Sequence, residues 1–159
     1  MPFKTQIRRA VLALVLPFLS TLPDGAEAYD QHSLYTQVSG WSIVSHTYSG
    51  QFGGCSAWTE QPGGFQLHLV NDGWDWKVGT TFSQADQING GIGIDGQRWT
   101  TTFFYNGDLM LSRLKGQIID AAAAGHRMRL QIGGNALDFS LAGSRDAINA
   151  VHACLGQTR

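Results

Sequence analysis

The chain has 159 residues, of which 43% are hydrophobic, 11% aromatic and 14% charged, and its formal net charge at pH 7 is −1. A near-neutral charge with scattered signs argues against nucleic acid or an acidic membrane surface as a partner. The length suits one domain with a sizeable core and is too short for two comfortable ones.

The N-terminus predicts a secretory signal peptide over residues 1–28. Lys4, Arg8 and Arg9 precede an apolar run at 10–19, and a small-residue cleavage site of the A-x-A kind follows at 26–28. The apolar run is too short to span a membrane. We therefore expect a mature chain, residues 29–159, that forms a single β-rich globular domain without a stable membrane span, periplasmic or secreted. An N-terminal anchor left uncleaved is the alternative.

The first half of the mature chain predicts antiparallel strands, because short runs rich in Trp, Val, Thr and Phe alternate with glycine-containing turns. Expected strands cover residues 41–48, 55–60, 65–70 and 74–82. Within 65–70, Phe65, Leu67 and Leu69 share one face, whereas Gln66 and His68 share the other. Further along, Asp95 and Gly96 lie between two β-prone runs and predict a tight hairpin.

The pattern then changes period. Leu111, Leu114, Ile118 and the alanines at 121–124 fit a helix over 109–124, with Gly125 as its stop. Residues 126–132 and 136–141 predict a final hairpin around "GGN".

The closing segment predicts an amphipathic helix. Ser144 is its expected N-cap and Asp146 complements its N-terminal dipole, and the expected buried stripe consists of Ile148, Val151, Cys154 and Leu155. The fold class is therefore α+β, a mainly antiparallel β sandwich or barrel-like sheet with one mid-chain helix and a C-terminal helix.

The chain contains two cysteines, Cys55 and Cys154. Export to an oxidising compartment and an even count together predict one disulfide bond between them. The alternative is a reactive thiol, but the sequence contains no CxxC pair.

The order of these signals resembles the invasion-associated locus B family of exported α-proteobacterial proteins. The resemblance is carried by "GWSIVS", "GGCSAW", "GIGIDGQRW", "GHRMRLQI" and "FSLAGSRDAINAV". The family's Gly-Cys step after the middle strand is absent, and its Gly-Phe before the last helix reads Gly143-Ser144 here. A separate family of small exported proteins with the same architecture is therefore the alternative. The resemblance implies a β-sandwich-like, non-catalytic periplasmic or surface protein linked to host-cell interaction.

The sequence shows no pattern typical of a catalytic or metal-binding site. The sequence contains no GxSxG, no HExxH, no EF-hand loop and no Cys/His cluster. "GIGIDG" has the spacing of a dinucleotide-binding loop, but its last glycine belongs to a hairpin instead of opening a helix. We therefore expect no catalytic residues, no bound metal and no cofactor.

Tryptophans are the candidate binding residues, because a large amphipathic ring left exposed often marks a binding surface. The candidates are Trp58, Trp74, Trp76 and Trp99. Packing of Trp74 and Trp76 in the core is the favoured interpretation, whereas Trp58 and Trp99, flanked by polar residues, are the ones that could project outward.

The sequence thus predicts a small exported, non-catalytic protein that acts through a binding surface on a protein or glycan at the envelope or a host interface. One alternative is an envelope enzyme inhibitor or accessory factor that uses the loop expected at residues 83–91. Another is a small hydrolase with an unrecognised site, which a cleft joining histidine to serine or aspartate would support.

Overall fold

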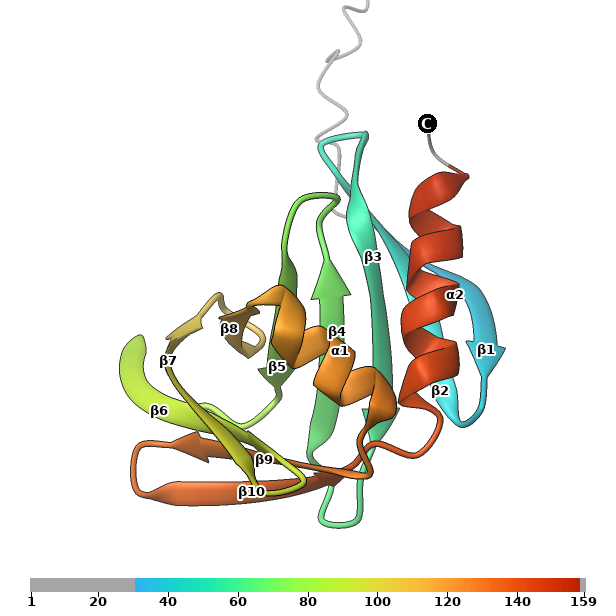
Figure 1. Cartoon of the computed structure of the whole chain (residues 1–159). Coiled ribbons are helices and arrows are strands. Elements are labelled where there is room, and N and C mark those ends of the chain that lie inside the picture. Colours follow the sequence, from blue (N-terminus) through green and yellow to red (C-terminus); the bar gives the residue numbers. More distant parts are fainter. Residues whose placement is uncertain (1–30, 158–159) are drawn as a thin grey trace, which may run out of the picture.

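The computed structural model describes residues 31–157, so the expected signal peptide lies outside the described residues. Ten strands and two helices follow in chain order: β1 (Gln31–Val38), β2 (Trp41–Tyr48), β3 (Gln51–Glu60), β4 (Gln66–Asn71), β5 (Trp76–Thr80), β6 (Gln87–Ile94), β7 (Gln97–Tyr105), β8 (Met110–Leu114), α1 (Gly116–Ala124), β9 (Arg127–Ile132), β10 (Asn135–Ser140) and α2 (Ser144–Gly156) (Figure 1).

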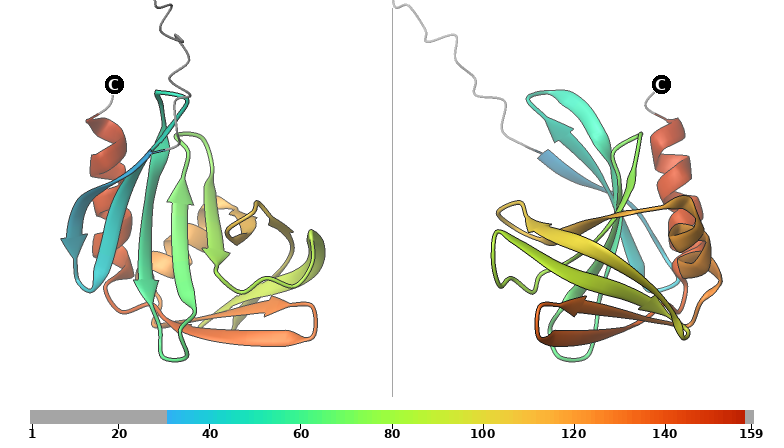
Figure 2. Two further views of the ribbon diagram at one scale, coloured as in Figure 1. Left: turned by 180° about the vertical axis from the view of Figure 1, so that it is seen from behind. Right: turned by 60° about the vertical axis from the view of Figure 1, so that its left-hand side comes forward.

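The strands form one antiparallel sheet in the order β1-β2-β3-β4-β5-β8-β7-β6-β9-β10. The sheet does not close, so β1 and β10 are its two edges. Both helices cover the same face of β1–β5, whereas β6, β9 and β10 run across one end of those strands (Figures 1 and 2). The predicted α+β class, with one mid-chain and one C-terminal helix, is confirmed.

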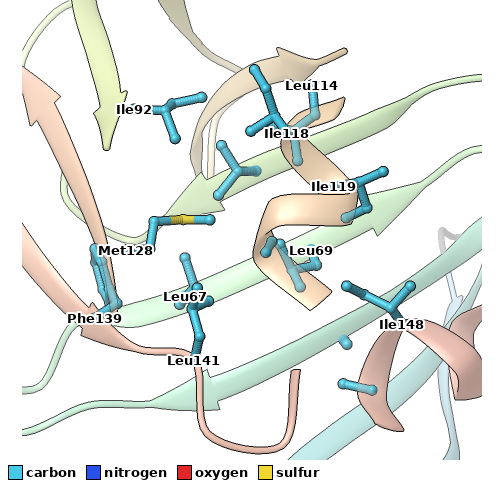
Figure 3. Packing of buried hydrophobic residues seen from close by; sticks show 14 of the residues in the cluster. Leu67, Leu69, Ile92, Leu114, Ile118, Ile119, Met128, Phe139, Leu141 and Ile148 are labelled. Atoms are coloured by element: carbon cyan, nitrogen blue, oxygen red, sulfur yellow. The ribbon is translucent and has the colours of Figure 1, made fainter. Parts of the chain in front are cut away.

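The core lies between the two helices, the sheet face that they cover and the strands β6–β10, which contribute Ile92, Met128 and Phe139 among others (Figure 3). Alternate residues of the strands point into it, such as Leu67 and Leu69 of β4, which are fully buried. Ile118 of α1 and Ile148 of α2 are buried in the same core. Period-2 alternation therefore assigns the intervening residues of β2, β3 and β4 to the opposite, uncovered face.

The predicted disulfide bond joins Cys55 of β3 to Cys154 of α2 across 99 residues, with a Cα–Cα distance of 6.3 Å. Both cysteines are buried, as are Ile148 and Val151 of the predicted stripe. The bond therefore attaches the last helix covalently to the middle of the sheet.

The predicted mid-chain helix is wrong at its N-terminal end, because Met110–Leu114 is the strand β8 and the helix begins at Gly116. β8 pairs with β5 over its whole length and with the end of β7. Leu111 and Leu114 have helical spacing with Ile118, but the vacant hydrogen-bonding edge of β5 decides the local conformation.

The predicted N-cap is also wrong. Gly143, with φ +78°, stands at that position, and a Cβ there would come within 2.4 Å of the backbone oxygen of Ser39. Ser144 is instead buried, and its Oγ donates to the carbonyl oxygen of Ala122, 2.7 Å away. That hydrogen bond connects the two helices.

The predicted hairpin at Asp95 and Gly96 is present between β6 and β7. Both residues have positive φ, +45° and +92°, as a type I′ turn requires. The loop expected at residues 83–91 is shorter, because β6 begins at Gln87 and pairs with β7 and β9.

Two parts of the sheet meet at a narrow pairing. β7 pairs with β6 over eight residues but with β8 through only two pairs, Phe104–Leu111 and Tyr105–Met110. The strands β1–β5 and β8 therefore form one part, and β6, β7, β9 and β10 the other.

Candidate functional site

A groove of about 710 Å³ lies on the uncovered face of β1–β5, the face seen from the front in the left view of Figure 2. The loop between β7 and β8 forms part of its wall through Asn106, Asp108 and Leu109. We call it the open-face groove. Its volume falls in the range of small-ligand sites, about 300–1,000 Å³.

Rings from four neighbouring strands line the open-face groove. They are His32 of β1, His46 and Tyr48 of β2, Trp58 of β3 and His68 of β4. None of these side chains points into the core, because each alternates with a core residue or lies at the edge of the sheet.

A hydrogen-bonded chain of three side chains crosses the first three strands. His32 Nδ1 lies 2.7 Å from His46 Nδ1, and His46 Nε2 lies 2.7 Å from Ser56 Oγ. Burial, and secondarily the neighbouring imidazole of His32, lower the pKa of His46 to about 4. His46 is therefore neutral near pH 7 and can act as a donor at one ring nitrogen and an acceptor at the other.

Trp58 and His68 are direct cross-strand partners on β3 and β4. Their ring centroids are 6.2 Å apart and their planes differ by 23°. His68 Nε2 donates to Gln66 Oε1 at 3.0 Å, which leaves Nδ1 as an acceptor. Burial, and secondarily His46, lower the pKa of His68 to about 4, so this imidazole is also neutral near pH 7.

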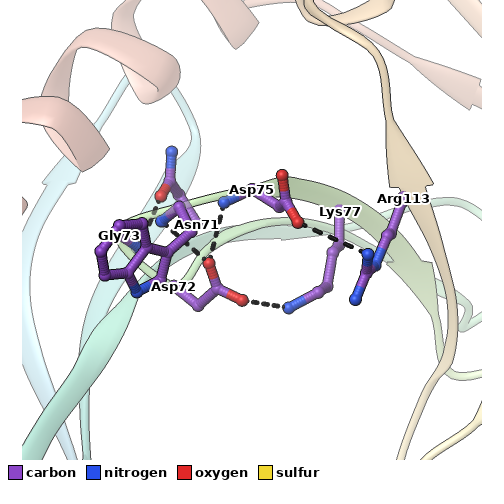
Figure 4. A network of polar contacts seen from close by, with 7 residues as sticks. Asn71, Asp72, Gly73, Asp75, Lys77 and Arg113 are labelled. Atoms are coloured by element: carbon purple, nitrogen blue, oxygen red, sulfur yellow. Dashed lines mark hydrogen bonds and ion pairs between the residues drawn. The ribbon is translucent and has the colours of Figure 1, made fainter.

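An ion-pair network lies at the rim of the groove, on the turn between β4 and β5 (Figure 4). Asp72 pairs with Lys77 and accepts the backbone N–H groups of Trp74 and Asp75 at 3.0 and 2.9 Å. Burial alone would raise the pKa of Asp72, but the N–H of Asp75, the ammonium of Lys77 and the N–H of Trp74 outweigh it and lower the pKa to about 2. The carboxylate of Asp72 thus compensates the charge of Lys77.

The four tryptophans singled out in the sequence do not share one surface. Only Trp58 lines the open-face groove. Trp74 lies in the β4–β5 turn and is 92% exposed, contrary to the core packing favoured for it. Trp76 is half-buried against His152 of α2, with ring centroids 5.4 Å apart, and Trp99 of β7 is half-buried against the core.

The sequence does not identify Ser56, His32, His46 or Gln66 as functional candidates. Alternation placed Gln66 and His68 on the polar face of their strand, and this signal was correct. Which residues of other strands face them depends on strand pairing, for which no short-range signal exists.

No metal site or membrane-spanning helix accompanies the groove in the part of the chain that the structure describes. Within residues 31–157, no three His, Cys, Asp or Glu side chains are grouped so that they could hold a metal ion. Over the same residues, neither helix has the length and apolar character needed to cross a membrane.

Comparison with known proteins adds a likeness in fold. No family model and no curated protein sequence matches the chain. Among solved structures, the chain is similar to invasion associated protein B from Bartonella henselae, at a TM-score of 0.59 and 17% identity, over 80% of this chain and 100% of that one. The resemblance to the invasion-associated locus B family is thus confirmed at the level of the fold.

Proposed function

We propose that this protein is a small exported, non-catalytic binding protein, periplasmic or secreted, and that the open-face groove is its binding surface. The observation that carries the proposal is the groove itself, which joins polar side chains and aromatic rings from β1–β5 on a face that no other element covers. The partner is a protein or a glycan at the cell envelope or a host surface.

Two further observations support the compartment and the setting. The disulfide bond between Cys55 and Cys154 is compatible with an oxidising, extracytoplasmic environment. The fold likeness is to a protein whose name associates it with invasion, which favours a role at a host interface.

The compartment is tested by expressing the whole chain and fractionating the cells. We expect the protein in the periplasm or medium, with a new N-terminus near residue 29 and no free thiol. Recovery of the intact chain in the membrane fraction would support the uncleaved anchor.

The binding surface is tested by retaining partners from envelope extract and host-surface material on the immobilised protein. Trp58→Ala removes the one candidate tryptophan that lines the groove, and Trp74→Ala is the matched control, because Trp74 is exposed outside it. We expect Trp58→Ala to lose the partner and Trp74→Ala to retain it. Equal retention by both variants would refute the groove as the binding surface.

Hydrolysis is a second candidate function, and the His32–His46–Ser56 chain is the observation that favours it. A nucleophilic serine needs a base within hydrogen-bond reach and a third group that orients the base, and the two 2.7 Å contacts supply this order. Ser56 is 3% exposed, so access of a substrate to its Oγ is the critical requirement. A fluorophosphonate that labels the wild-type protein but not Ser56→Ala would establish this function, and an unlabelled wild type would exclude it.

A further inference from the structure

The charge of the open-face groove restricts what it can bind. Among the described residues that line the groove, Lys77 is the one Lys or Arg, and its ammonium pairs with Asp72. His46 and His68 are neutral near pH 7, because burial lowers the pKa of each imidazole. The carboxylate of Asp108 also belongs to the lining of the groove. An anionic ligand would therefore meet no uncompensated Lys or Arg and one carboxylate of like charge, which disfavours it.

The groove also offers a ring on which a ligand can pack. Trp58 is partly exposed in the wall of the groove, next to His68. An indole combines a large apolar area with little conformational freedom to lose, so it contributes much of the binding energy where a ligand covers it. The C–H groups on one face of a sugar ring are apolar enough to pack against such a ring.

The groove that Trp58 lines also offers hydrogen-bonding groups of both kinds. Gln66 accepts from His68 through its oxygen, and Asn106 accepts the N–H groups of Asp108 and Leu109 through its oxygen, so the amide nitrogen of each remains as a donor. His68 Nδ1 and the carboxylate of Asp108 supply acceptors. A hydroxyl group donates and accepts at once, so a ligand rich in hydroxyls can satisfy this mixture.

From these observations we propose that the open-face groove binds a neutral oligosaccharide, with a sugar ring packed on Trp58 and hydroxyls bonded to Gln66, Asn106 and Asp108. This inference rests on the proposed binding function and names the ligand class of the same site. Acidic sugars are disfavoured by the compensated Lys77 and the carboxylate of Asp108.

The test is a calorimetric titration of the folded, exported protein with two matched sets of oligosaccharides. One set is neutral, built of glucose, galactose and N-acetylglucosamine, and the other carries the same cores ending in a uronic or sialic acid. We expect binding of members of the neutral set and at least about tenfold weaker binding of their acidic counterparts. Equal or tighter binding of the acidic set would overturn the inference, as would binding of neither set.

Variants locate the site. Trp58→Ala should weaken binding of the neutral ligand at least about tenfold, Trp58→Phe less, and Trp74→Ala not at all. Asp72→Asn should shift the preference toward acidic ligands, because it leaves the charge of Lys77 uncompensated. Neutral-ligand binding that survives Trp58→Ala, in a variant with an unchanged thermal midpoint, would place the sugar elsewhere and refute the proposal.

The titration tests the ligand class of the groove, and the retention experiment tests whether the groove binds a partner at all. If neither oligosaccharide set binds but Trp58→Ala still loses a protein partner that Trp74→Ala retains, the groove is a binding surface of another ligand class. If the two variants behave alike in both experiments, the binding function of the groove fails as well.

Discussion

Removal of the Cys55–Cys154 bond should destabilise the protein mainly through its unfolded state. The bond closes a loop of 99 residues, and in the chain-entropy model a loop of about 100 residues restricts the unfolded chain by about 4.7 kcal/mol. The double variant Cys55→Ala, Cys154→Ala keeps small apolar side chains at two buried positions, so its loss should stay near this value. At about 2–8 °C per kcal/mol for domains near this size, the thermal midpoint should fall by roughly 10–40 °C.

The assay is thermal and urea unfolding of wild type and double variant, each with and without reductant. Reductant should bring the wild type to the midpoint of the variant and leave the variant unchanged, because only the wild type has a bond to lose. A variant that remains within 1–2 °C of the oxidised wild type would refute the reasoning about the unfolded chain. A reductant effect of equal size on both proteins would show that the bond is not its target.

Three further perturbations follow from burial and backbone geometry. Between pH 6.5 and about 4 the unfolded chain binds protons that the imidazoles of His46 and His68 exclude in the folded state, so the free energy of unfolding should fall as the pH is lowered through this window. His68 accounts for at most about 3 kcal/mol of this decrease in the free energy of unfolding. Urea unfolding at pH 7 and at pH 4.5 measures the decrease, which should be smaller in His68→Gln than in the wild type. Gly54→Ala should lower the free energy of unfolding, measured in urea, by roughly 2–4 kcal/mol. The reason is that φ of Gly54 is +129° and a Cβ there would lie 2.4 Å from the backbone oxygen of Asn71 in the next strand. A decrease below about 0.5 kcal/mol would contradict this. Leu67→Ala, at a fully buried position, should cost about 2–5 kcal/mol, whereas Leu34→Ala, 63% exposed, should change the midpoint little; similar losses for both would disprove the assignment of the core.

Features of the fold set by a few adjacent residues were predictable. The turn at Asp95 and Gly96 needs two residues with positive φ, which this pair tolerates, and the hairpin formed where expected. The buried stripe of α2 follows from the spacing of Ile148, Val151 and Cys154. The cysteines are 99 residues apart, but their pairing was predictable for another reason, because the chain has two of them and the expected compartment is oxidising.

Features that depend on distant partners were not predictable. The apolar residues of Met110–Leu114 have helical spacing with those that follow, yet this segment forms a strand because it pairs with β5 and with the end of β7. His32, His46 and Ser56 become neighbours only through the register of β1, β2 and β3, so no spacing in the sequence could assemble their chain. Trp74 and Trp76 are two residues apart, which predicts the same strand face for both. Trp74, however, lies before the start of β5, in a turn where its backbone N–H donates to Asp72, and the indole of Trp74 is exposed to solvent.

The two-pair junction between β7 and β8 has a consequence for motion. Local openings require least free energy where few hydrogen bonds and contacts must break, so the two parts of the sheet should exchange amide hydrogens as separate cooperative units. The loop that joins these strands carries Asn106 and Asp108 into the groove wall, immediately beside the junction. A ligand bound to that loop would stabilise the junction between the two parts of the sheet. Occupancy of the groove should therefore slow amide exchange in β6, a strand that contributes no residue to the groove.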